Sequence, residues 1–275
     1  MRKIKSVDVF KVLLTLIFAF FILFPISYLV ITSVKPSKIL MSTPPKYFFQ
    51  PDFTQYVKIF RNGDILNGLV NSIVISTLST IGALIISVMF SYGFVHIRFK
   101  WKKLLLFVIL ITRMFPPVTT LIPVYMVEGR LGLADTRLGL ILPYISFQVP
   151  LIIWIINEFM FQIPKEIEES AALDGCTVGQ MFRYINVPLI MPGITAAGIL
   201  AFIYNWNELM FAVTLTSYKA RTLPVLLKAF TESEGSLQWS AVSAIGVITL
   251  IPIILFFVLM NKYLVKGLVA GAVKG

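Results

Sequence analysis

The sequence has few charged residues and almost none of the side chains that build metal or redox sites. Charged residues make up 13% of the 275 residues, about half of the roughly 25% that is usual in soluble domains. There is one cysteine, Cys176, and one histidine, His96. An internal disulfide and a cysteine-rich metal site are therefore excluded, and a cysteine–histidine catalytic pair is not expected. We predict no metal site and no cofactor.

The sequence also lacks the G-x-x-x-x-G-K-[ST] pattern of a phosphate-binding loop, and no nucleophile–base pair stands out. We therefore predict that the chain is not an enzyme, and that any ATP hydrolysis it depends on takes place in another chain. The formal net charge is +11, but the basic residues lie at the ends of apolar runs. This placement indicates membrane topology and contact with anionic lipid headgroups, and it argues against nucleic-acid binding.

Hydrophobic residues make up 57% of the chain, and they gather in blocks long enough to cross a membrane. A helix needs about 20 apolar residues to cross the hydrocarbon core. The first block is too long for the apolar region of a signal peptide, so we expect it to remain as an anchor. We predict an all-α, polytopic membrane protein with six transmembrane helices, at about residues 12–34, 69–95, 104–127, 138–159, 189–216 and 241–263.

Lysine and arginine residues are more frequent on the side of the predicted membrane that holds the N-terminus, the short turn 98–103 and the C-terminus. The positive-inside rule then places both termini, and the polar stretch 161–188, in the cytoplasm. We divide the chain into residues 1–68, which hold the N-terminal segment, the first span and an external loop, and a core at 69–275. The loop carries an aromatic cluster, which forms either an amphipathic element at the membrane surface or a cover over the outer helix ends: Tyr47, Phe48, Phe49, Phe53 and Tyr56.

The polar stretch between the fourth and fifth blocks begins with signals for a short helix. Pro164 suits a first helical position. Asp174-Gly175 supplies a stop, because glycine tolerates the left-handed conformation that often follows a helix. Negative charge is favoured near a helix N-terminus, and three glutamates follow Pro164: Glu166, Glu168 and Glu169.

A second short helix is predicted to begin directly afterwards. Thr177 and Gln180 have the spacing of a capping box. The next apolar residues fall at i, i+3, i+4 and i+7, which predicts one apolar stripe, at Val178, Met181, Phe182 and Ile185. A membrane-protein loop with this much local order indicates a docking surface, although an ordinary amphipathic surface linker is the alternative.

This stretch resembles the EAA loop of ABC-importer permeases. That pattern is E-A-A, three residues, G, nine residues, I, one residue, L-P, and the chain keeps every spacing. Ser170 stands in place of the first alanine, and Val187 in place of leucine. The resemblance implies that the stretch couples to an ATPase, with candidate coupling residues Glu169, Ser170, Ala171, Asp174, Gly175, Ile185 and Pro188.

Two groups of polar residues interrupt the apolar blocks. Arg113 precedes Pro116-Pro117, and a charge near mid-membrane normally faces a cavity or a partner. The prolines predict a kinked or unwound helix, either lining a pathway or acting as a structural kink. The second group consists of Asn205, Trp206, Asn207 and Glu208. It either lines a translocation pathway or forms inter-helix hydrogen bonds. Arg113 is a candidate partner for the Glu208 carboxylate.

The run 206–216 resembles W-N-E-F-L-F-A-L-T-x-T of carbohydrate-importer permeases, and the ending 267–275 resembles G-L-T-A-G-A-V-K-G of the same family. Both point to the maltose-type, MalG-like permeases. The resemblance implies the type I ABC-importer permease fold in a prokaryotic plasma membrane. It also implies partners: a second homologous permease, a homodimer or pair of ATP-binding subunits, an extracytoplasmic sugar-binding protein, and membrane lipid.

By this resemblance, ATP binding would move the first short helix, at about 164–173, and the spans would respond by alternating access. Two alternatives stay open. One is a permease of the same superfamily for another solute, such as a glycerol phosphate or a polyamine. The other is a self-sufficient secondary transporter or channel, which would account for Arg113 and Glu208 but not for the motif-spaced loop.

Overall fold

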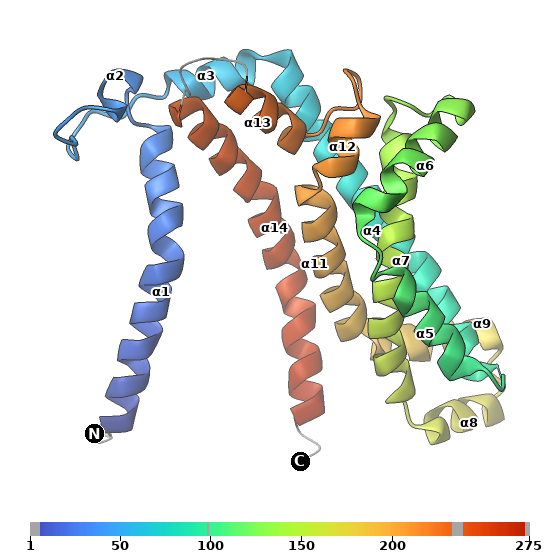
Figure 1. Ribbon diagram of the computed structural model, residues 1–275. Coiled ribbons are helices and arrows are strands. Elements are labelled where there is room, and N and C mark those ends of the chain that lie inside the picture. Colours follow the sequence, from blue (N-terminus) through green and yellow to red (C-terminus); the bar gives the residue numbers. More distant parts are fainter. Residues whose placement is uncertain (1–5, 98, 233–238, 273–275) are drawn as a thin grey trace. The chain divides into compact units, whose positions relative to one another are not determined.

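The computed structural model describes residues 6–97, 99–232 and 239–272 (Figure 1). Every regular element within these residues is helical, which confirms the predicted all-α class. Residue contacts divide the chain into two compact units. Unit 1 comprises residues 1–66 and 226–251, and unit 2 comprises residues 67–225 and 252–275.

Unit 1 contains α1 (Ser6–Ser33), α2 (Ser37–Leu40) and α3 (Thr54–Arg61). In the most apolar 18-residue segment of α1, no residue is buried inside the protein. A helix that is apolar on all sides and unburied requires lipid or a partner helix around it. The C-terminal end of α1 is tied to α3, because the Ser33 and Tyr56 hydroxyl oxygens lie 2.7 Å apart.

The aromatic residues of the cluster at 47–56 differ in their surroundings. Tyr56 contacts the end of α1, whereas the Phe48 side chain is 99% exposed. Asp52 starts α3, because its carboxylate accepts hydrogen bonds from the Thr54 backbone N–H at 2.9 Å and from the Thr54 hydroxyl. The hydrogen bond from the Thr54 hydroxyl contributes most, and the one from the Thr54 backbone N–H contributes next, to holding the pKa of Asp52 below its ordinary value.

Unit 2 is a bundle built on α4, α7 and α11. One core cluster joins these three helices, and it includes Ala83, Ile152 and Ala197. A second cluster joins α4, α7 and α12, and it includes Ile75 and Phe211. The helices that lie wholly or partly in this unit are α4 (Gly63–His96), α5 (Lys102–Thr112), α6 (Pro117–Leu131), α7 (Arg137–Phe161), α8 (Lys165–Leu173), α9 (Val178–Met181), the π-helix η1 (Phe182–Asn186), α10 (Val187–Leu189), α11 (Met191–Asn207), α12 (Met210–Leu215), α13 (Leu223–Glu232) and α14 (Trp239–Ala272).

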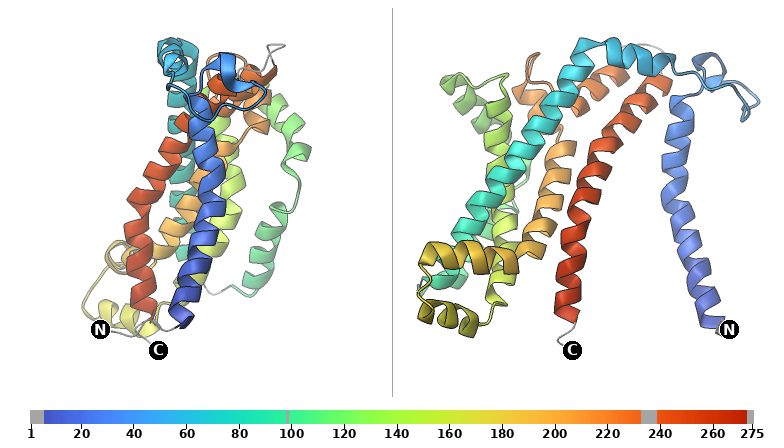
Figure 2. Two further views of the ribbon diagram at one scale, coloured as in Figure 1. Left: turned by 90° about the vertical axis from the view of Figure 1, so that its left-hand side faces the viewer. Right: turned by 180° about the vertical axis from the view of Figure 1, so that it is seen from behind.

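Small serines on α4 allow it to approach α7 closely. The Ser79, Ser87 and Ser91 hydroxyls donate to the carbonyl oxygens of Ile141, Val149 and Ile153, respectively. Each pair is separated by 62 residues, and this constant offset means that α4 and α7 run in the same direction. The chain between them, α5 and α6, must therefore return to the starting end of the bundle, as Figures 1 and 2 show.

The described residues contain four helices long and apolar enough to cross a membrane, or up to six if two bent helix pairs each count as one span. The first pair, α5 and α6, bends by 83° at the predicted Arg113–Pro117 break, and the second pair, 178–189 and 191–207, bends by 70°. The prediction of one continuous helix at 189–216 is wrong, because α11 ends at Asn207 and α12 begins at Met210.

Gly193 is required where α11 passes α7. A Cβ atom there would lie 2.4 Å from Cδ2 of Phe159, whereas a Cβ at Gly93, inside α4, would meet nothing within 4 Å. We expect Gly193→Ala to destabilise the chain by about 1–3 kcal/mol through overpacking. Gly93→Ala should be neutral or slightly stabilising. Thermal unfolding of the purified chains in detergent measures both, and equal unfolding temperatures would contradict the predicted close contact.

Candidate functional site

The polar stretch forms a short helix, a turn and a second helix beyond one end of α4, α7 and α11 (Figures 1 and 2). The first helix, α8, begins at Lys165, so Pro164 is its N-cap and not, as predicted, its first residue. The predicted stop is confirmed, since Asp174 is the C-cap and Gly175 has a φ of 82°. Glycine adopts this left-handed conformation without steric cost.

The predicted capping box is also present. The Gln180 backbone N–H donates to the Thr177 hydroxyl oxygen at 3.3 Å, and the Thr177 backbone N–H donates to the Gln180 side chain at 2.8 Å. The apolar stripe is only partly formed, because α9 ends after one turn and the π-helix η1 follows. Phe182 packs on Tyr92 with ring centroids 4.9 Å apart, whereas Val178 is 70% exposed. A change of helical period explains this difference, because the predicted stripe assumed an uninterrupted α-helix.

Glu168 joins α8 to two other parts of unit 2. His96, at the end of α4, has its Nε2 3.0 Å from Oε2 of Glu168. The amide of Asn186, at the end of η1, donates to Oε1 of the same carboxylate. Asn186 is fully buried. One carboxylate therefore fixes α8 to α4 on one side and to the segment that leads into α11 on the other.

Both ring nitrogens of His96 face oxygen acceptors. Its Nδ1 lies 2.7 Å from the Tyr92 carbonyl oxygen, and its Nε2 lies 3.0 Å from Oε2 of Glu168. The ring donates to one or both of these oxygens, depending on its tautomer and protonation. With a protonated ring the contact between His96 and Glu168 is an ion pair, and it is the one such pair found among the described residues.

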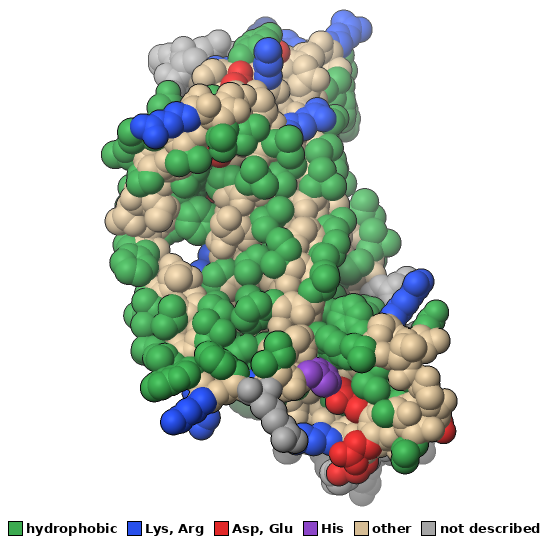
Figure 3. All heavy atoms as spheres, turned by 90° about the vertical axis from the view of Figure 1, so that its right-hand side faces the viewer, with side chains coloured by type: hydrophobic (Ala, Val, Ile, Leu, Met, Phe, Trp, Pro, Cys, Tyr) green, Lys and Arg blue, Asp and Glu red, His purple; other side chains and the backbone are tan. Residues whose placement is uncertain are grey.

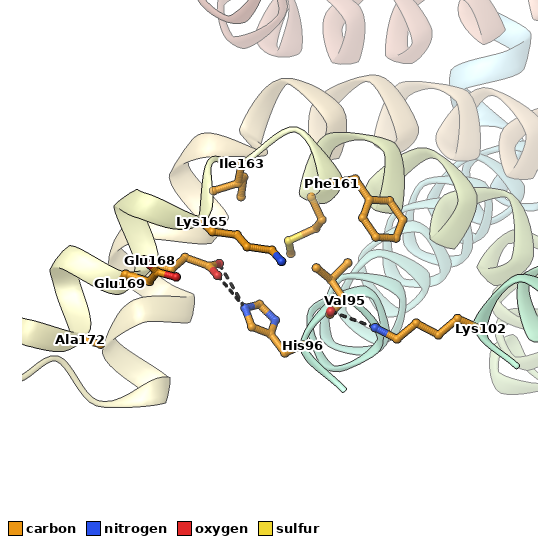
Figure 4. Close-up of a pocket in the computed structure, with 10 residues that line it drawn as sticks. Val95, His96, Lys102, Phe161, Ile163, Lys165, Glu168, Glu169 and Ala172 are labelled. Atoms are coloured by element: carbon orange, nitrogen blue, oxygen red, sulfur yellow. Dashed lines mark hydrogen bonds and ion pairs between the residues drawn. The ribbon is translucent and has the colours of Figure 1, made fainter. Parts of the chain in front are cut away.

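A cavity of about 500 Å³ lies between α8 and the ends of α4, α5 and α7. Figure 4 shows the His96–Glu168 pair on one side of it and Lys102, which donates to the Val95 carbonyl at 3.0 Å, on another. Lys165 and Glu169 complete its charged lining. Figure 3 shows acidic side chains and histidine gathered beside basic ones at this end of the molecule, next to an apolar face.

The motif residues separate into buried and exposed ones. Ala171 is only 7% exposed and packs inside the chain, and Ile185 is half-buried. Leu173, on the outer side of α8, is 89% exposed. The remaining motif residues are also exposed: Glu169, Ser170, Asp174, Gly175 and Pro188. We call the exposed residues 166, 169, 170, 172 and 173 the outer face of α8; residues 169 and 172 lie at its edge, where they also border the cavity.

Arg113 lies at the break between α5 and α6, and Pro116 is the N-cap of α6. The Nη1 of Arg113 donates to the Phe147 carbonyl oxygen at 2.9 Å, and the guanidinium carbon of Arg113 lies 5.0 Å from the centre of the Tyr204 ring. The predicted pairing of Arg113 with Glu208 is therefore wrong. A carbonyl on α7 and an aromatic ring on α11 are its partners instead.

Glu208 lies at the break between α11 and α12, where it replaces missing backbone hydrogen bonds. Its carboxylate accepts from the backbone N–H groups of Phe211 and Ala212 at 3.0 and 3.2 Å, and from the Tyr144 hydroxyl at 2.6 Å. Asn205 donates to the Thr80 hydroxyl at 3.2 Å. These contacts favour the inter-helix hydrogen-bond interpretation for both residues.

The other two residues of this group differ from each other in exposure. Trp206 is 1% exposed and stacks on Phe202 with ring centroids 5.8 Å apart. Asn207 is exposed, and its amide donates to the Ile203 carbonyl at 2.7 Å. Asn207 is thus the one exposed member of this group.

Asp135 organises the opposite end of unit 2. It lies between α6 and α7 with a φ of 56°, and its carboxylate accepts from four successive backbone N–H groups, those of residues 217–220, at 3.0–3.1 Å. Burial raises the pKa of this carboxyl, but the four backbone hydrogen bonds outweigh burial and leave it below its ordinary value. The carboxylate therefore holds the 217–220 loop in place.

Sequence reasoning did not select His96, Asn186 or Asp135 as site residues, and it used Glu168 only as a favourable charge at a helix start. Asn186 lies inside the motif-spaced stretch, directly before Val187-Pro188, so its position was a usable signal. His96 and Asp135 carry no such signal, because their partners lie 72 or more residues away in the sequence.

Comparison with known proteins gives a consistent result. A family model described as binding-protein-dependent transport system inner membrane component matches residues 83–269. The trehalose transport system permease protein SugB of Mycobacterium tuberculosis is 38% identical over 258 residues, covering 92% of this chain and 90% of the relative. The trehalose/maltose transport system permease protein MalG of Thermococcus litoralis is 31% identical, covering 94% of both chains.

A chain in the crystal structure of a bacterial ABC transporter involved in the import of the acidic polysaccharide alginate has a TM-score of 0.78 and 23% identity. The match covers 96% of this chain and 98% of that one. A second structure, of a bacterial alginate ABC transporter in complex with an alginate pentasaccharide-bound periplasmic protein, has a TM-score of 0.68 and 16% identity. These likenesses confirm the predicted ABC-importer permease fold.

The Asp135 contacts predict how the 217–220 loop responds to mutation and pH. Asp135→Asn removes the negative charge, and we expect amide hydrogen exchange in the loop to become about tenfold faster, because hydrogen bonds to charged groups are worth about 1.5 kcal/mol or more. Since the folded pKa is lowered, the stabilisation is present above the ordinary value of 3.8 and is lost as the pH falls through the lowered pKa. Asp64→Asn, an exposed carboxylate at another helix start, is the control. Unchanged exchange in the Asp135 variant would contradict the assignment.

Proposed function

The chain belongs to the family of binding-protein-dependent transport system inner membrane components, and on this basis we propose that it is the permease subunit of an ATP-driven carbohydrate importer. It is a multi-pass membrane protein of that family. The observation that carries the proposal is the family match over residues 83–269, which includes the whole of α8, α9 and η1. The two relatives described above are named for the transport of trehalose or maltose, which supports a sugar as the solute.

The proposed assembly has three other kinds of subunit. A second, homologous permease completes the pathway, a pair of ATP-binding subunits hydrolyses ATP, and an extracytoplasmic sugar-binding protein delivers the solute. The chain has no phosphate-binding loop of its own, which supports ATP hydrolysis in a partner. The alginate structure with a bound periplasmic protein supports the third kind of subunit by analogy.

We propose six membrane crossings in the prokaryotic inner membrane, with both termini and α8 on the cytoplasmic side. The parallel direction of α4 and α7 supports counting the bent α5–α6 pair as one crossing. An even total then leaves both termini on one side. The basic turn 98–103 supports that side being the cytoplasm, although Arg98 and the basic residues 2, 3 and 5 lie outside the described residues, as do residues 273–275 of the family-like ending.

The proposed coupling uses the two sides of α8 for different tasks. Its outer face, which includes Glu169, docks on the ATP-binding subunit. Glu168, on another side, connects α8 to His96 on α4 and to Asn186 before α11. ATP would bias α8 between two positions, as a two-state switch requires. The ion pair and the buried amide would carry that displacement to both helices.

For the translocation pathway we propose the break at Arg113 and Pro116 together with Asn207. Arg113 lies at the 83° bend, and an intramembrane charge at a bend is typical of a pathway. Asn205, Trp206 and Glu208 belong to the same region, where their hydrogen bonds and stacking support the α11–α12 break behind the pathway. A broken helix is tolerated in a membrane where protein or water satisfies the freed backbone groups.

Reversing the charge on the outer face should release the ATP-binding subunit. We expect Glu169→Lys to lower recovery of that subunit about tenfold in pull-downs from membranes, since a charge reversal replaces an attraction by a repulsion, while the second permease is retained. Gly175→Pro should have the same effect, because proline cannot adopt a φ of 82°. Glu158→Lys, on the exposed side of α7, is the charge-matched control. Full recovery with both variants, measured by mass spectrometry, would remove α8 as the docking helix.

Removing the histidine should weaken transmission rather than docking. We expect His96→Ala to lower the amount of sugar moved per ATP hydrolysed in proteoliposomes, because α8 then moves without its attachment to α4. The ATP-binding subunit should still co-purify. His96→Lys, which restores a positive charge near Glu168, should recover part of the ratio. A His96→Ala complex with the same transport-to-hydrolysis ratio as the wild type would show that the ion pair carries no coupling.

A further inference from the structure

Glu128, in the last turns of α6, is a buried carboxylate that the chain itself does not satisfy. Its side chain is 5% exposed, and its Oε2 is buried without a hydrogen-bond partner. A buried polar group without a partner costs free energy. The position is unfavourable for a second reason, since the C-terminal end of a helix repels negative charge. Nothing in the local structure therefore explains an acidic residue here.

The fold nevertheless makes room for this carboxylate. A Cβ atom at Gly139, in the first turn of α7, would lie 2.9 Å from Oε2 of Glu128 and 2.4 Å from the Leu133 carbonyl oxygen. Only glycine allows α7 to pass so close to the acid and to the chain that leads into α7. The unpartnered oxygen is thus held in a defined place by two elements.

Glu128 lines a cavity of about 490 Å³ between α6 and α7 that also reaches Arg113. From Thr120, near the Arg113 end, to Glu128 the cavity follows α6 for eight residues, or about 12 Å. Its walls are largely apolar and include Pro143 and Phe147. Arg113 donates from Nη1 to the Phe147 carbonyl, which leaves its other N–H groups available to a ligand.

We propose that this cavity is a binding site for a neutral, hydroxyl-rich solute of about disaccharide size, with Glu128 accepting a hydroxyl hydrogen at one end and Arg113 donating at the other. The volume lies within the roughly 300–1,000 Å³ of small-molecule sites, and such sites combine apolar walls with a few placed polar groups. The inference rests on the proposed carbohydrate transport, and it adds Glu128 as the residue that selects the solute.

A sugar fits these groups better than a lipid chain does. An acyl chain would leave Oε2 of Glu128 unpartnered, whereas one sugar hydroxyl would donate to the carboxylate and another would accept from the guanidinium. The carbon face of a sugar ring would lie against Phe147 and Pro143. The ligand supplies the hydrogen-bond donor that the carboxylate lacks. A solute without that hydroxyl leaves the buried carboxylate without a partner and therefore binds more weakly, which makes the site selective.

The test measures initial uptake by the assembled complex in proteoliposomes, with its second permease, ATP-binding subunits and binding protein. Radiolabelled trehalose, maltose and glycerol 3-phosphate are the probes. We expect Glu128→Leu to raise the KM for the transported disaccharide about tenfold or more, since a hydrogen bond to a charged group is worth this much. Glu128→Gln, which keeps the shape and one acceptor oxygen, should give a smaller rise. Glu158→Gln removes an exposed carboxylate outside the cavity and is the matched control.

The outcomes separate the site from the transport function. Wild-type uptake of none of the three probes would overturn the carbohydrate proposal and, with it, this site. Wild-type disaccharide uptake with an unchanged KM in both Glu128 variants would overturn the site alone. Loss of the second permease from pull-downs of the Glu128→Gln complex would also overturn it, because the carboxylate would then pair with that subunit. A graded KM with intact assembly supports the proposed site.

Discussion

A polar group buried away from water must find a partner within the protein, and this constraint explains most of the side chains that interrupt the apolar helices. The broken α11–α12 segment exposes two backbone N–H groups, and Glu208 accepts both. Arg113 has the Phe147 carbonyl, and α4 serines bond to α7 carbonyls. In a low-dielectric environment each of these contacts is worth more than it would be in water. Several buried side-chain atoms have no partner in the chain, and Glu128 is the one acidic residue among them in the described part of the chain.

The same constraint distributes rigidity along unit 2. Two apolar clusters and the inter-helix hydrogen bonds fix α4, α7 and α11 against one another. The α8–α9 pair lies outside these clusters. Its polar attachments are the Glu168 carboxylate, with two partners, and a hydrogen bond from the Tyr92 hydroxyl to the Val178 carbonyl oxygen at 3.4 Å. A segment with few buried apolar contacts opens at a lower free energy than the core does. In the proposed coupling, the motion is confined to this end of unit 2, while the bundle keeps its register.

Local patterns in the sequence predicted the features that depend on neighbouring residues. The capping box at Thr177, the left-handed Gly175 and the break at Arg113–Pro117 follow from steric and hydrogen-bonding rules within a few residues. The partner of Arg113 was not predictable in this way, because it depends on which helix lies opposite the break. The α11–α12 interruption was missed for a similar reason. Residues 207–210 contain neither proline nor glycine. The helix ends where the Glu208 carboxylate, which also accepts from the Tyr144 hydroxyl on α7, becomes the acceptor for the Phe211 and Ala212 backbone N–H groups.

Adjacent glutamates on α8 show why a motif position and its neighbour have different tasks. In an α-helix with 3.6 residues per turn, consecutive side chains differ in direction by about 100°. Glu168 therefore turns to His96 and Asn186 of the same chain, while Glu169 remains on the outer face. The Glu168 carboxylate already bonds to two residues of its own chain, so few of its acceptor positions remain for another subunit. Among the described residues, the exposed Glu169 carboxylate makes no hydrogen bond to α4. In the proposed coupling, docking and transmission therefore fall to two different acidic residues, which one helix carries between the proposed ATP-binding subunit and the spans.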